Sequence, residues 1–354
     1  MEEGVEVEDV RTAPPAGLPS TLGGTGWLPR TLGHREEVAA GSLWARCGYR
    51  SEVAVLREVL LSDPPRSLAS VGDAGAQLMT DPVDPGLLRE QSRAIAEAYR
   101  RHGVTVHLTS PPSAAPPNVI FLRDLFLVTP EGAVLGRTAS RQRAGEERHA
   151  ALALAELGIP ILRTVTGTAT FEGADALWVD ERTVLVGCGF RTNREGFDVV
   201  RECLRHQGVE AVAVPLGPGV QHLLGSVVFV DHRRAVLHRA AATGALRREL
   251  SERGYSTVEL DPDDEVVRRR AMNFVTLAPG RILMPAGCPH TRRALEGAGI
   301  AVDTVEVGEY VKAAGALGCL TGVLRRGEED GRDAAALNRG PAAVERSAAW
   351  RPGS

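Results

Sequence analysis

The sequence lacks any apolar run that approaches the roughly 20 residues of a membrane-spanning helix, so we expect no membrane partner. It also lacks a strong charge of either sign, because 41 Lys and Arg residues against 45 Asp and Glu residues leave a net charge of -4. This balance gives no electrostatic basis for binding nucleic acid. The first residues, Met1-Glu-Glu-Gly-Val-Glu, show no apolar stretch behind a basic region. We therefore expect no secretory signal and a cytoplasmic location.

Cysteine is scarce, and its spacing excludes two common site classes. The chain has five cysteines, an odd number with no C-x-x-C pair: Cys47, Cys188, Cys203, Cys288 and Cys319. This pattern predicts neither a disulfide framework nor a zinc site, and it favours reduced thiols. By default each cysteine is expected to be a small buried hydrophobic residue.

The ends of the 354-residue chain differ in composition from its middle. Residues 1–40 are rich in Gly, Pro and Thr without a hydrophobic period, which predicts a disordered extension. Residues 327–354 begin with Gly-Glu-Glu-Asp-Gly-Arg-Asp and are expected to be a polar tail. The ordered domain is then predicted to span residues 45–326.

A repeated pattern of hairpin, helix and third strand predicts an α/β fold. It recurs at intervals of about 45 to 55 residues. The first strands of four copies are expected at 119–128, 176–180, 227–231 and 274–277, and each is followed by a second strand, a helix and a third strand. A fifth copy is split: residues 321–326 supply its first strand, and 53–61, 85–102 and 104–108 supply the rest. Five units with a last unit closed by both termini would form a ring without exposed sheet edges. An open α/β sheet is the alternative.

Reactive residue types occur at four junctions between these units. Asp124 is expected in the first strand of one unit, while Glu172, His222 and Cys319 come just before the first strands of others. A thiolate can attack a cationic carbon, an imidazole can move protons, and carboxylates can bind a guanidinium through paired, charge-assisted hydrogen bonds. Individually, a lone His is more often structural, and an isolated Asp or Glu at a turn is usually solvated or capping. Cys319 follows the Gly-rich segment Gly315-Ala-Leu-Gly, which would allow a tight loop.

The motifs around these residues resemble those of the guanidine-modifying (pentein) superfamily. They are Phe-Leu-Arg-Asp124, Phe-Glu172-Gly-Ala-Asp175, Gln-His222-Leu and Lys312-Ala-Ala-Gly-Ala-Leu-Gly-Cys319-Leu-Thr, in the family's order. The resemblance is nearest to dimethylarginine dimethylaminohydrolases and extends to arginine deiminases and amidinotransferases. It implies a five-fold pseudo-symmetric ββαβ propeller, in agreement with the repeat.

The resemblance also implies roles for the site residues. Cys319 resembles the nucleophile, His222 the general acid and base, and Glu172 the catalytic carboxylate that holds the guanidinium. On the substrate-binding side, Asp124 resembles a second guanidinium-binding carboxylate, and Asp175 resembles an acid that bonds to backbone. Arg191, in Phe190-Arg-Thr-Asn, and Arg141, in Ser140-Arg-Gln-Arg, resemble arginines that bind the substrate α-carboxylate. Solvent-facing arginines are the alternative for both.

One departure from the family bears on the substrate. Deiminases and amidinotransferases carry His-x-Asp, and here the third position is Leu224, as in dimethylaminohydrolases. The implied activity is hydrolysis of the guanidinium C–N bond of arginine or an N-methylated arginine, without metal or organic cofactor, giving a ureido product such as citrulline. An amidinotransferase or an arginine deiminase or dihydrolase is the alternative, as is a non-catalytic ring like that of a ribosome anti-association factor. The oligomeric state stays open, with a homodimer as one option.

Overall fold

The computed structural model describes residues 17–327, whose strands form five separate three-stranded sheets. In every sheet two strands pair antiparallel, and one of these also pairs in parallel with a third strand. Four sheets are continuous in sequence: β3 (Phe126–Thr129), β4 (Gly132–Leu135) and β5 (Ile161–Thr164); β6 (Ala176–Asp180), β7 (Thr183–Cys188) and β8 (Glu210–Pro215); β9 (Val227–Asp231), β10 (Arg234–His238) and β11 (Ser256–Leu260); β12 (Val275–Ala278), β13 (Arg281–Pro285) and β14 (Ala301–Val305). This arrangement confirms a mixed α/β fold with five repeated units.

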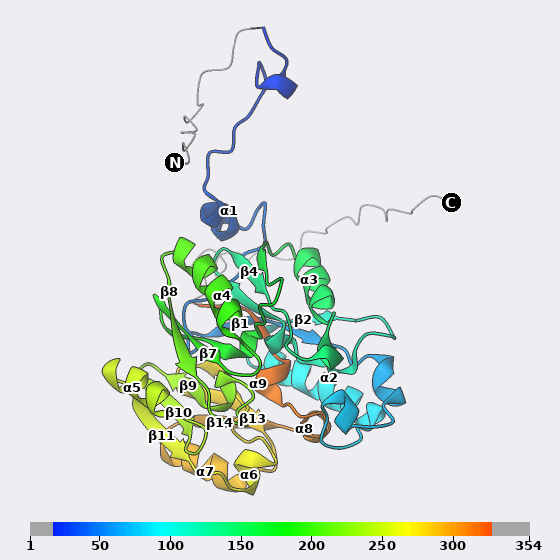
Figure 1. Cartoon of the computed structure of the whole chain (residues 1–354), viewed down its shortest axis with the longest axis vertical. Helices are drawn as coiled ribbons and strands as arrows, with labels where there is room; N and C mark the ends of the chain where they lie inside the picture. Colours follow the sequence, from blue (N-terminus) through cyan, green and yellow to red (C-terminus); the bar gives the residue numbers. More distant parts are fainter. Residues whose placement is uncertain (1–16, 328–354) are drawn as a thin grey trace.

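The fifth sheet combines strands from distant parts of the chain. β1 (Leu56–Ser62) pairs antiparallel with β15 (Gly322–Arg326) and parallel with β2 (Thr105–Thr109). Figure 1 shows these strands, coloured blue and orange-red, together in the middle of the body. The predicted split unit is therefore present as a sheet.

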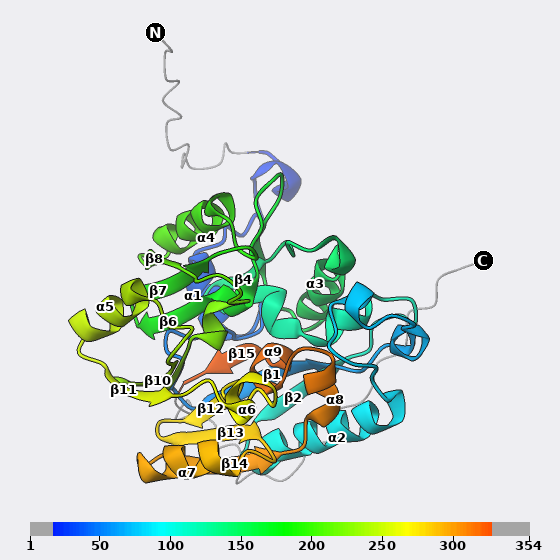
Figure 2. The ribbon, with the colours of Figure 1, turned by 60° about the horizontal axis from the view of Figure 1, so that its bottom comes forward.

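One helix connects the second and third strands of each unit. These helices are α2 (Pro85–Arg101), α3 (Glu147–Glu156), α4 (Arg194–His206), α5 (Gly244–Glu252) and α7 (Pro289–Gly297). Figure 2 shows them around the outside of the molecule, with the short α9 (Leu317–Leu320) at the centre. Side-chain caps begin several of them: Asp84 accepts from the backbone of α2, and Asn193 from that of α4.

Each of the five helices is followed by a glycine with a positive φ angle. This backbone conformation ends a helix at little cost only when no Cβ is present, so the glycine turns the chain into the third strand. The five glycines are Gly103, Gly158, Gly208, Gly254 and Gly299. The helix ends therefore repeat from unit to unit, as the strands do.

The structure differs from the prediction for residues 119–128. They form two 3-10 turns, η4 (Pro117–Ile120) and η5 (Leu122–Asp124), followed by β3, so Asp124 precedes the strand instead of lying within it. The whole segment is buried, and a continuously buried run shows no period that separates a strand from a turn.

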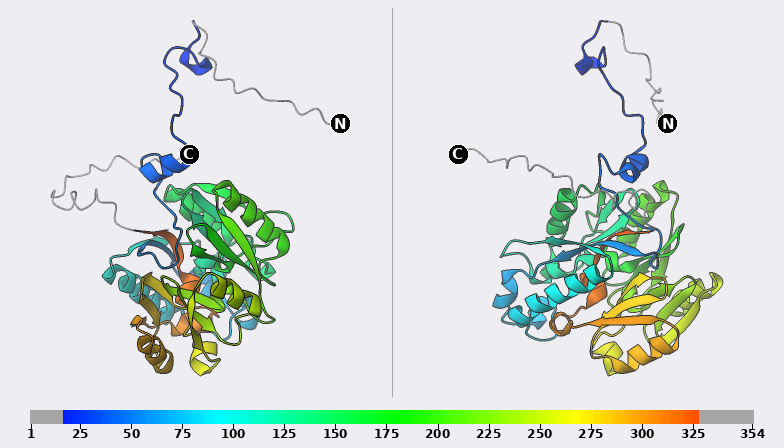
Figure 3. Two further views of the ribbon diagram at one scale, coloured as in Figure 1. Left: turned by 90° about the vertical axis from the view of Figure 1, so that its left-hand side faces the viewer. Right: turned by 180° about the vertical axis from the view of Figure 1, so that it is seen from behind.

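The predicted disordered extension contains a helix. α1 (His34–Ala40) buries Val38, and the His34 ring lies 2.8 Å from the Glu131 carbonyl oxygen in the β3–β4 turn. The prediction is therefore wrong for this part of residues 17–40, because one anchoring contact and one apolar residue are too little signal in a short segment. The segment before α1 extends away from the body (Figure 3). Of the predicted tail 327–354, only Gly327 falls within the described residues.

Two further properties concern partners and redox state. None of the helices within residues 17–327 combines the length and apolar character needed to cross a membrane. The five cysteines are all free thiols. The remaining short helices, α6 (Asp264–Val267) and α8 (Gly308–Lys312), lie on the connections that lead to β12 and to α9.

Candidate active site

Four short turns bring the predicted residues to the centre of the molecule. Asp124 ends η5, Glu172 precedes η7 (Gly173–Asp175), His222 precedes η8 (Leu223–Gly225), and Cys319 lies in α9. Each turn leads directly into the first strand of a unit, as the sequence predicted for the junctions. The turns pack tightly, since a Cβ on Gly173 would approach the Phe126 carbonyl oxygen to 2.2 Å. Glycine is therefore required beside Glu172.

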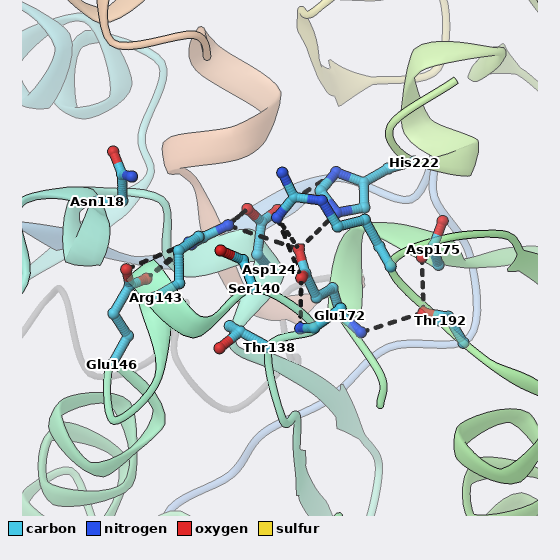
Figure 4. Close-up of polar contacts among 12 residues, drawn as sticks. Asn118, Asp124, Thr138, Ser140, Arg143, Glu146, Glu172, Asp175, Thr192 and His222 are labelled. Carbon is cyan, nitrogen blue, oxygen red and sulfur yellow. Dashed lines mark hydrogen bonds and ion pairs between the residues drawn. The ribbon is translucent and has the colours of Figure 1, made fainter. Parts of the chain in front are cut away.

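His222 lies between two carboxylates (Figure 4). Its Nε2 atom is 2.7 Å from Glu172 Oε2, and its Nδ1 atom is 3.8 Å from Asp124 Oδ1. All three residues are at most 3% exposed. Burial alone would lower the pKa of His222, but the charge of Asp124 and the hydrogen bond to Glu172 outweigh it and raise this pKa to about 9. His222 is therefore an imidazolium at neutral pH.

The electrostatics of Glu172 follow from its cationic neighbours. Burial would raise the pKa of Glu172, but the hydrogen bond and charge of His222 and the charges of Arg143 and Arg191 lower it. Its Oε1 atom also accepts a hydrogen bond from the Ala139 backbone N–H, at 3.1 Å. Glu172 is therefore a fixed, ionised carboxylate.

Arg143 is one site residue that the sequence analysis did not predict. Its Nη1 donates to Asp124 Oδ2 at 2.6 Å and lies 3.5 Å from Glu172 Oε2, so one guanidinium bridges both carboxylates. Its Nε and Nη2 donate to Glu146, three residues further along the chain. The signal in the sequence was the R-x-x-E spacing of Arg143 and Glu146, which places both residues on one face of a helical turn.

The two predicted arginines occupy different environments. Arg191 is 8% exposed, and its Nη1 donates to both Glu172 oxygens at 3.2 and 3.3 Å. Arg141 is exposed, and its side chain makes no hydrogen bond or ion pair within the described part of the chain. The structure therefore brings Arg191 into the site and leaves Arg141 outside it.

Asp175 supports the site without facing it. Its carboxylate is fully buried and accepts hydrogen bonds from Thr192 Oγ1 at 2.6 Å and from the Leu223 backbone N–H at 2.9 Å. Burial raises the pKa of Asp175 to about 7. Because its partners follow Arg191 and His222 directly in the sequence, Asp175 ties together the two turns that carry these residues.

Cys319 is held by Asn273, a second residue that sequence reasoning missed. The Asn273 Nδ2 atom donates to the Cys319 sulfur at 3.0 Å, and Oδ1 accepts from the Cys319 backbone N–H at 3.1 Å. Burial and the charge of Asp124 raise the pKa of the thiol, while Asn273 and Arg270 oppose this rise. Asn273 lies just before β12, at the one junction for which no candidate was predicted. Its position just before a first strand is the sequence signal that would have indicated it.

Cys319 lines two cavities of unequal size. The acid cavity, defined by Asp124, Arg143, Arg191, Gln221 and Cys319, has a free volume of about 20 Å³. That is room for about one water molecule. The Arg270 cavity, defined by Gln221, His222, Leu224, Arg270, Asn273 and Cys319, has about 300 Å³. Open space beside the sulfur therefore lies mainly on the Arg270 side.

Three donor groups also have the spacing of a metal site. Ligand atoms of Asp124, Glu172 and His222 lie within 4.8 Å of one another. The same carboxylates already bind the guanidinium groups of Arg143 and Arg191. A metal ion would have to displace or neighbour these cations, so the arrangement fits a planar guanidinium better than a metal.

Known proteins resemble this chain in sequence and in fold. A family model described as arginine deiminase matches residues 88–252. An uncharacterised protein of Aeropyrum pernix is 30% identical over 65% of this chain and 82% of its own length. A dimethylarginine dimethylaminohydrolase of Streptomyces coelicolor is 29% identical over 69% of this chain and 88% of its own. A solved mutant of the Pseudomonas aeruginosa dimethylarginine dimethylaminohydrolase, complexed with citrulline, superposes with a TM-score of 0.63 at 23% identity, covering 75% of this chain and 98% of that one.

Proposed function

Because the chain belongs to the guanidine-modifying (pentein) superfamily, we propose that it hydrolyses a guanidinium C–N bond of arginine or an N-methylated arginine through a covalent adduct on Cys319. The products would be a ureido amino acid such as citrulline and an amine. The observation that carries the proposal is that Asp124 and Glu172 already hold guanidinium groups, those of Arg143 and Arg191. The site therefore already binds groups of the kind that the substrate would present.

One carboxylate oxygen remains available for the substrate. Asp124 Oδ1 is buried and accepts no hydrogen bond from any residue within 17–327. A buried acceptor without a partner costs about 1–3 kcal/mol, which a substrate N–H would recover. When the substrate guanidinium enters, it displaces Arg143 or Arg191 from the carboxylates. The released Arg191 can then bind the substrate α-carboxylate.

In the proposed reaction His222 serves as the proton donor. The Cys319 thiolate attacks the guanidinium carbon, and the His222 imidazolium donates its proton to the departing amine as the C–N bond breaks. A thiouronium adduct remains on the sulfur. Neutral His222 then takes a proton from water, whose oxygen attacks the same carbon and releases the thiolate. Glu172 holds the His222 ring throughout, and its negative charge stabilises the imidazolium.

Asn273 compensates in part for the burial of Cys319. A thiolate in a dry pocket is disfavoured by desolvation. An N–H donor on the sulfur favours the charged form, and the bound substrate brings a positive charge close to it. We expect the thiolate to form chiefly once the substrate is in place.

Amidino transfer is the second candidate, favoured by the free volume beside Cys319. An amine in the Arg270 cavity would attack the same adduct in place of water. Leu224 favours the hydrolase over an arginine deiminase, since it removes the carboxylate that would accept hydrogen bonds from an unsubstituted guanidinium.

Mass analysis of products distinguishes these activities. The protein is incubated with arginine, monomethylarginine and dimethylarginine, with and without acceptor amines, in water enriched in ¹⁸O. Hydrolysis gives citrulline carrying ¹⁸O, whereas transfer gives a new guanidine and no label. Absence of any product or adduct from all three compounds would contradict the proposal.

The ring arrangement belongs to the same proposal. We propose that the five units close around a central axis on which the site lies. β15 pairs with β1 and also contacts β3 of the next unit, which supports closure through the split unit.

A further inference from the structure

The Arg270 cavity is open space that the proposed reaction does not yet use. Two residues of the reaction, Cys319 and His222, form part of its wall. With a free volume of about 300 Å³, it falls at the small end of the range for ligand pockets. Anything that fills it therefore lies beside both the nucleophile and the proton donor.

The geometry of a guanidinium determines what would lie there. Its three nitrogens share one plane, and Asp124 and Glu172 can hold the nitrogens on the acid side. The nitrogen that departs must face His222, because that residue protonates it. A substituent on the departing nitrogen would therefore extend into the Arg270 cavity.

The walls of this cavity are apolar in part. Leu224 is 7% exposed, and Val266 and Met272 are equally well buried. Leu224 stands where the family's His-x-Asp motif has its acid. An alkyl chain would bury apolar surface against these residues, which is worth about 25 cal/mol for each Å².

Arg270 adds a positive charge without a partner. It is half-buried, and its side chain makes no hydrogen bond or ion pair with any residue between 17 and 327. Its charge acts on the Cys319 sulfur and opposes the rise of the thiol pKa that burial and Asp124 cause. Its backbone has a φ angle of 54°, a left-handed conformation that is uncommon for a side chain of this size. A cation held in this way is suited to bind an anion.

Building on the proposed function, we propose that the Arg270 cavity binds the N-substituent of the substrate guanidinium, and that this substituent is a short alkyl chain ending in a carboxylate. The substrate class is then an Nω-(carboxyalkyl) guanidino acid. Hydrolysis breaks the bond to the substituted nitrogen. His222 protonates it, and the leaving group is an ω-amino acid. Water supplies the oxygen of the ureido product.

The test compares two substrates of equal length. Nω-(2-carboxyethyl)arginine carries the anion and Nω-propylarginine does not. We expect the wild-type kcat/KM to favour the carboxyethyl compound by about tenfold to hundredfold, the range of a charge-assisted hydrogen bond. Arg270→Met should bring this ratio close to one. Arg270→Gly should also bring the ratio close to one. Glycine adopts the left-handed conformation easily, so this variant provides the test if Arg270→Met folds poorly.

A nearby arginine provides the matched control. The Arg268 side chain is 83% exposed and, among residues 17–327, pairs only with Asp264, so Arg268→Met should keep the wild-type preference. A lower kcat/KM for unsubstituted arginine in Arg270→Met, equal to the loss for the carboxyethyl compound, would overturn the proposal. It would assign Arg270 to the α-carboxylate. A wild-type preference for the propyl compound would overturn it as well.

Binding separates this proposal from the proposed function. In the Cys319→Ser protein, Kd for both compounds is measured by calorimetry, with and without Arg270→Met. If the carboxyethyl compound binds more tightly than the propyl compound, and Arg270→Met abolishes this difference, the subsite is supported even when wild type shows no turnover. Equal Kd values overturn it even if arginine is hydrolysed.

Discussion

The Asn273 side chain contacts Cys319 at two atoms, donating to its sulfur at 3.0 Å and accepting from its backbone N–H at 3.1 Å. The backbone contact determines which end of the amide faces the sulfur, because only the oxygen can accept from an N–H. The sulfur therefore faces an N–H donor. This donor favours the thiolate without adding a charge to the site.

Replacing Asn273 by Asp should make Cys319 less reactive. The carboxylate can still accept from the backbone N–H, but it presents an oxygen in place of a donor to the sulfur, so the thiol pKa rises. We expect alkylation by iodoacetamide at pH 8 to slow by about tenfold, which corresponds to one pKa unit. Asn193→Asp is the control, since Asp also caps a helix. An unchanged pH dependence of alkylation in Asn273→Asp would show that the donor has no influence on the thiol.

Cys319→Ser should abolish turnover and adduct formation. A serine hydroxyl at this position is a far weaker nucleophile, and we expect a loss of more than about a thousandfold in kcat. Intact-mass spectrometry after an acid quench should detect the thiouronium adduct in wild type and not in the variant. Cys288→Ser alters a buried thiol whose sulfur lies beside the Ala286 carbonyl, and it should form the adduct normally. An adduct that persists in Cys319→Ser would assign the nucleophile elsewhere.

The pKa of His222, raised to about 9, predicts an alkaline limit of activity. Above that pH the ring loses the proton that the leaving amine needs, so kcat/KM should fall. The folded pKa exceeds the unfolded value near 6.5, so protonation of His222 stabilises the fold fully below pH 6.5. This stabilisation is lost as the pH rises through 9.

NMR titration of the ring provides the measurement. Glu172→Gln removes a negative charge and a hydrogen bond that raise the pKa of His222, so its titration should move to lower pH. The His238 ring, whose pKa burial lowers, serves as an internal reference. A midpoint that stays near 9 in Glu172→Gln would contradict the assigned cause.

Arg143→Ala should destabilise the fold much more than Arg141→Ala. Removing Arg143 takes away the cation that pairs with buried Glu146 and leaves Asp124 with the more distant His222, and breaking such a buried pair costs about 3–5 kcal/mol. The exposed Arg141 makes no such contact, and its loss should change the free energy of unfolding by less than about 0.5 kcal/mol. Urea denaturation of both variants gives the comparison. Similar midpoints would show that the Arg143 network contributes little to stability.

Periodic features of the chain could be predicted from sequence, and local exceptions could not. The strands from Ala176 to Asp180 and from Val227 to Asp231 have the predicted bounds, because each stays apolar between clear turn signals. The segment that leads to Asp124 was predicted as a strand because it belongs to an almost continuous apolar run. Its turn hydrogen bonds, such as Asp124 N–H to the Phe121 carbonyl oxygen, leave no trace in the hydrophobic pattern.

The candidate site shows a similar division. Residue type and junction position indicated Cys319, His222, Glu172 and Asp124, and the structure brings the last three into one cluster. Arg141 and Arg143 are separated by one residue and have the same chemistry, and the R-x-x-E spacing of Arg143 and Glu146 is the feature that distinguishes them. Which side chain turns inward depends on Glu146, which is fully buried and pairs with Arg143.

The pairing of β1 with β15 has a consequence for how the chain folds during synthesis. β1 leaves the ribosome early, whereas its antiparallel partner is made about 260 residues later, at an ordinary rate of about 5–20 residues per second. For many seconds that edge of β1 has no partner and can template wrong pairing. Four units can form their sheets from neighbouring sequence, but the fifth waits for nearly the whole chain. The last step of folding is then expected to bring α9, and with it the reactive thiol, to the centre.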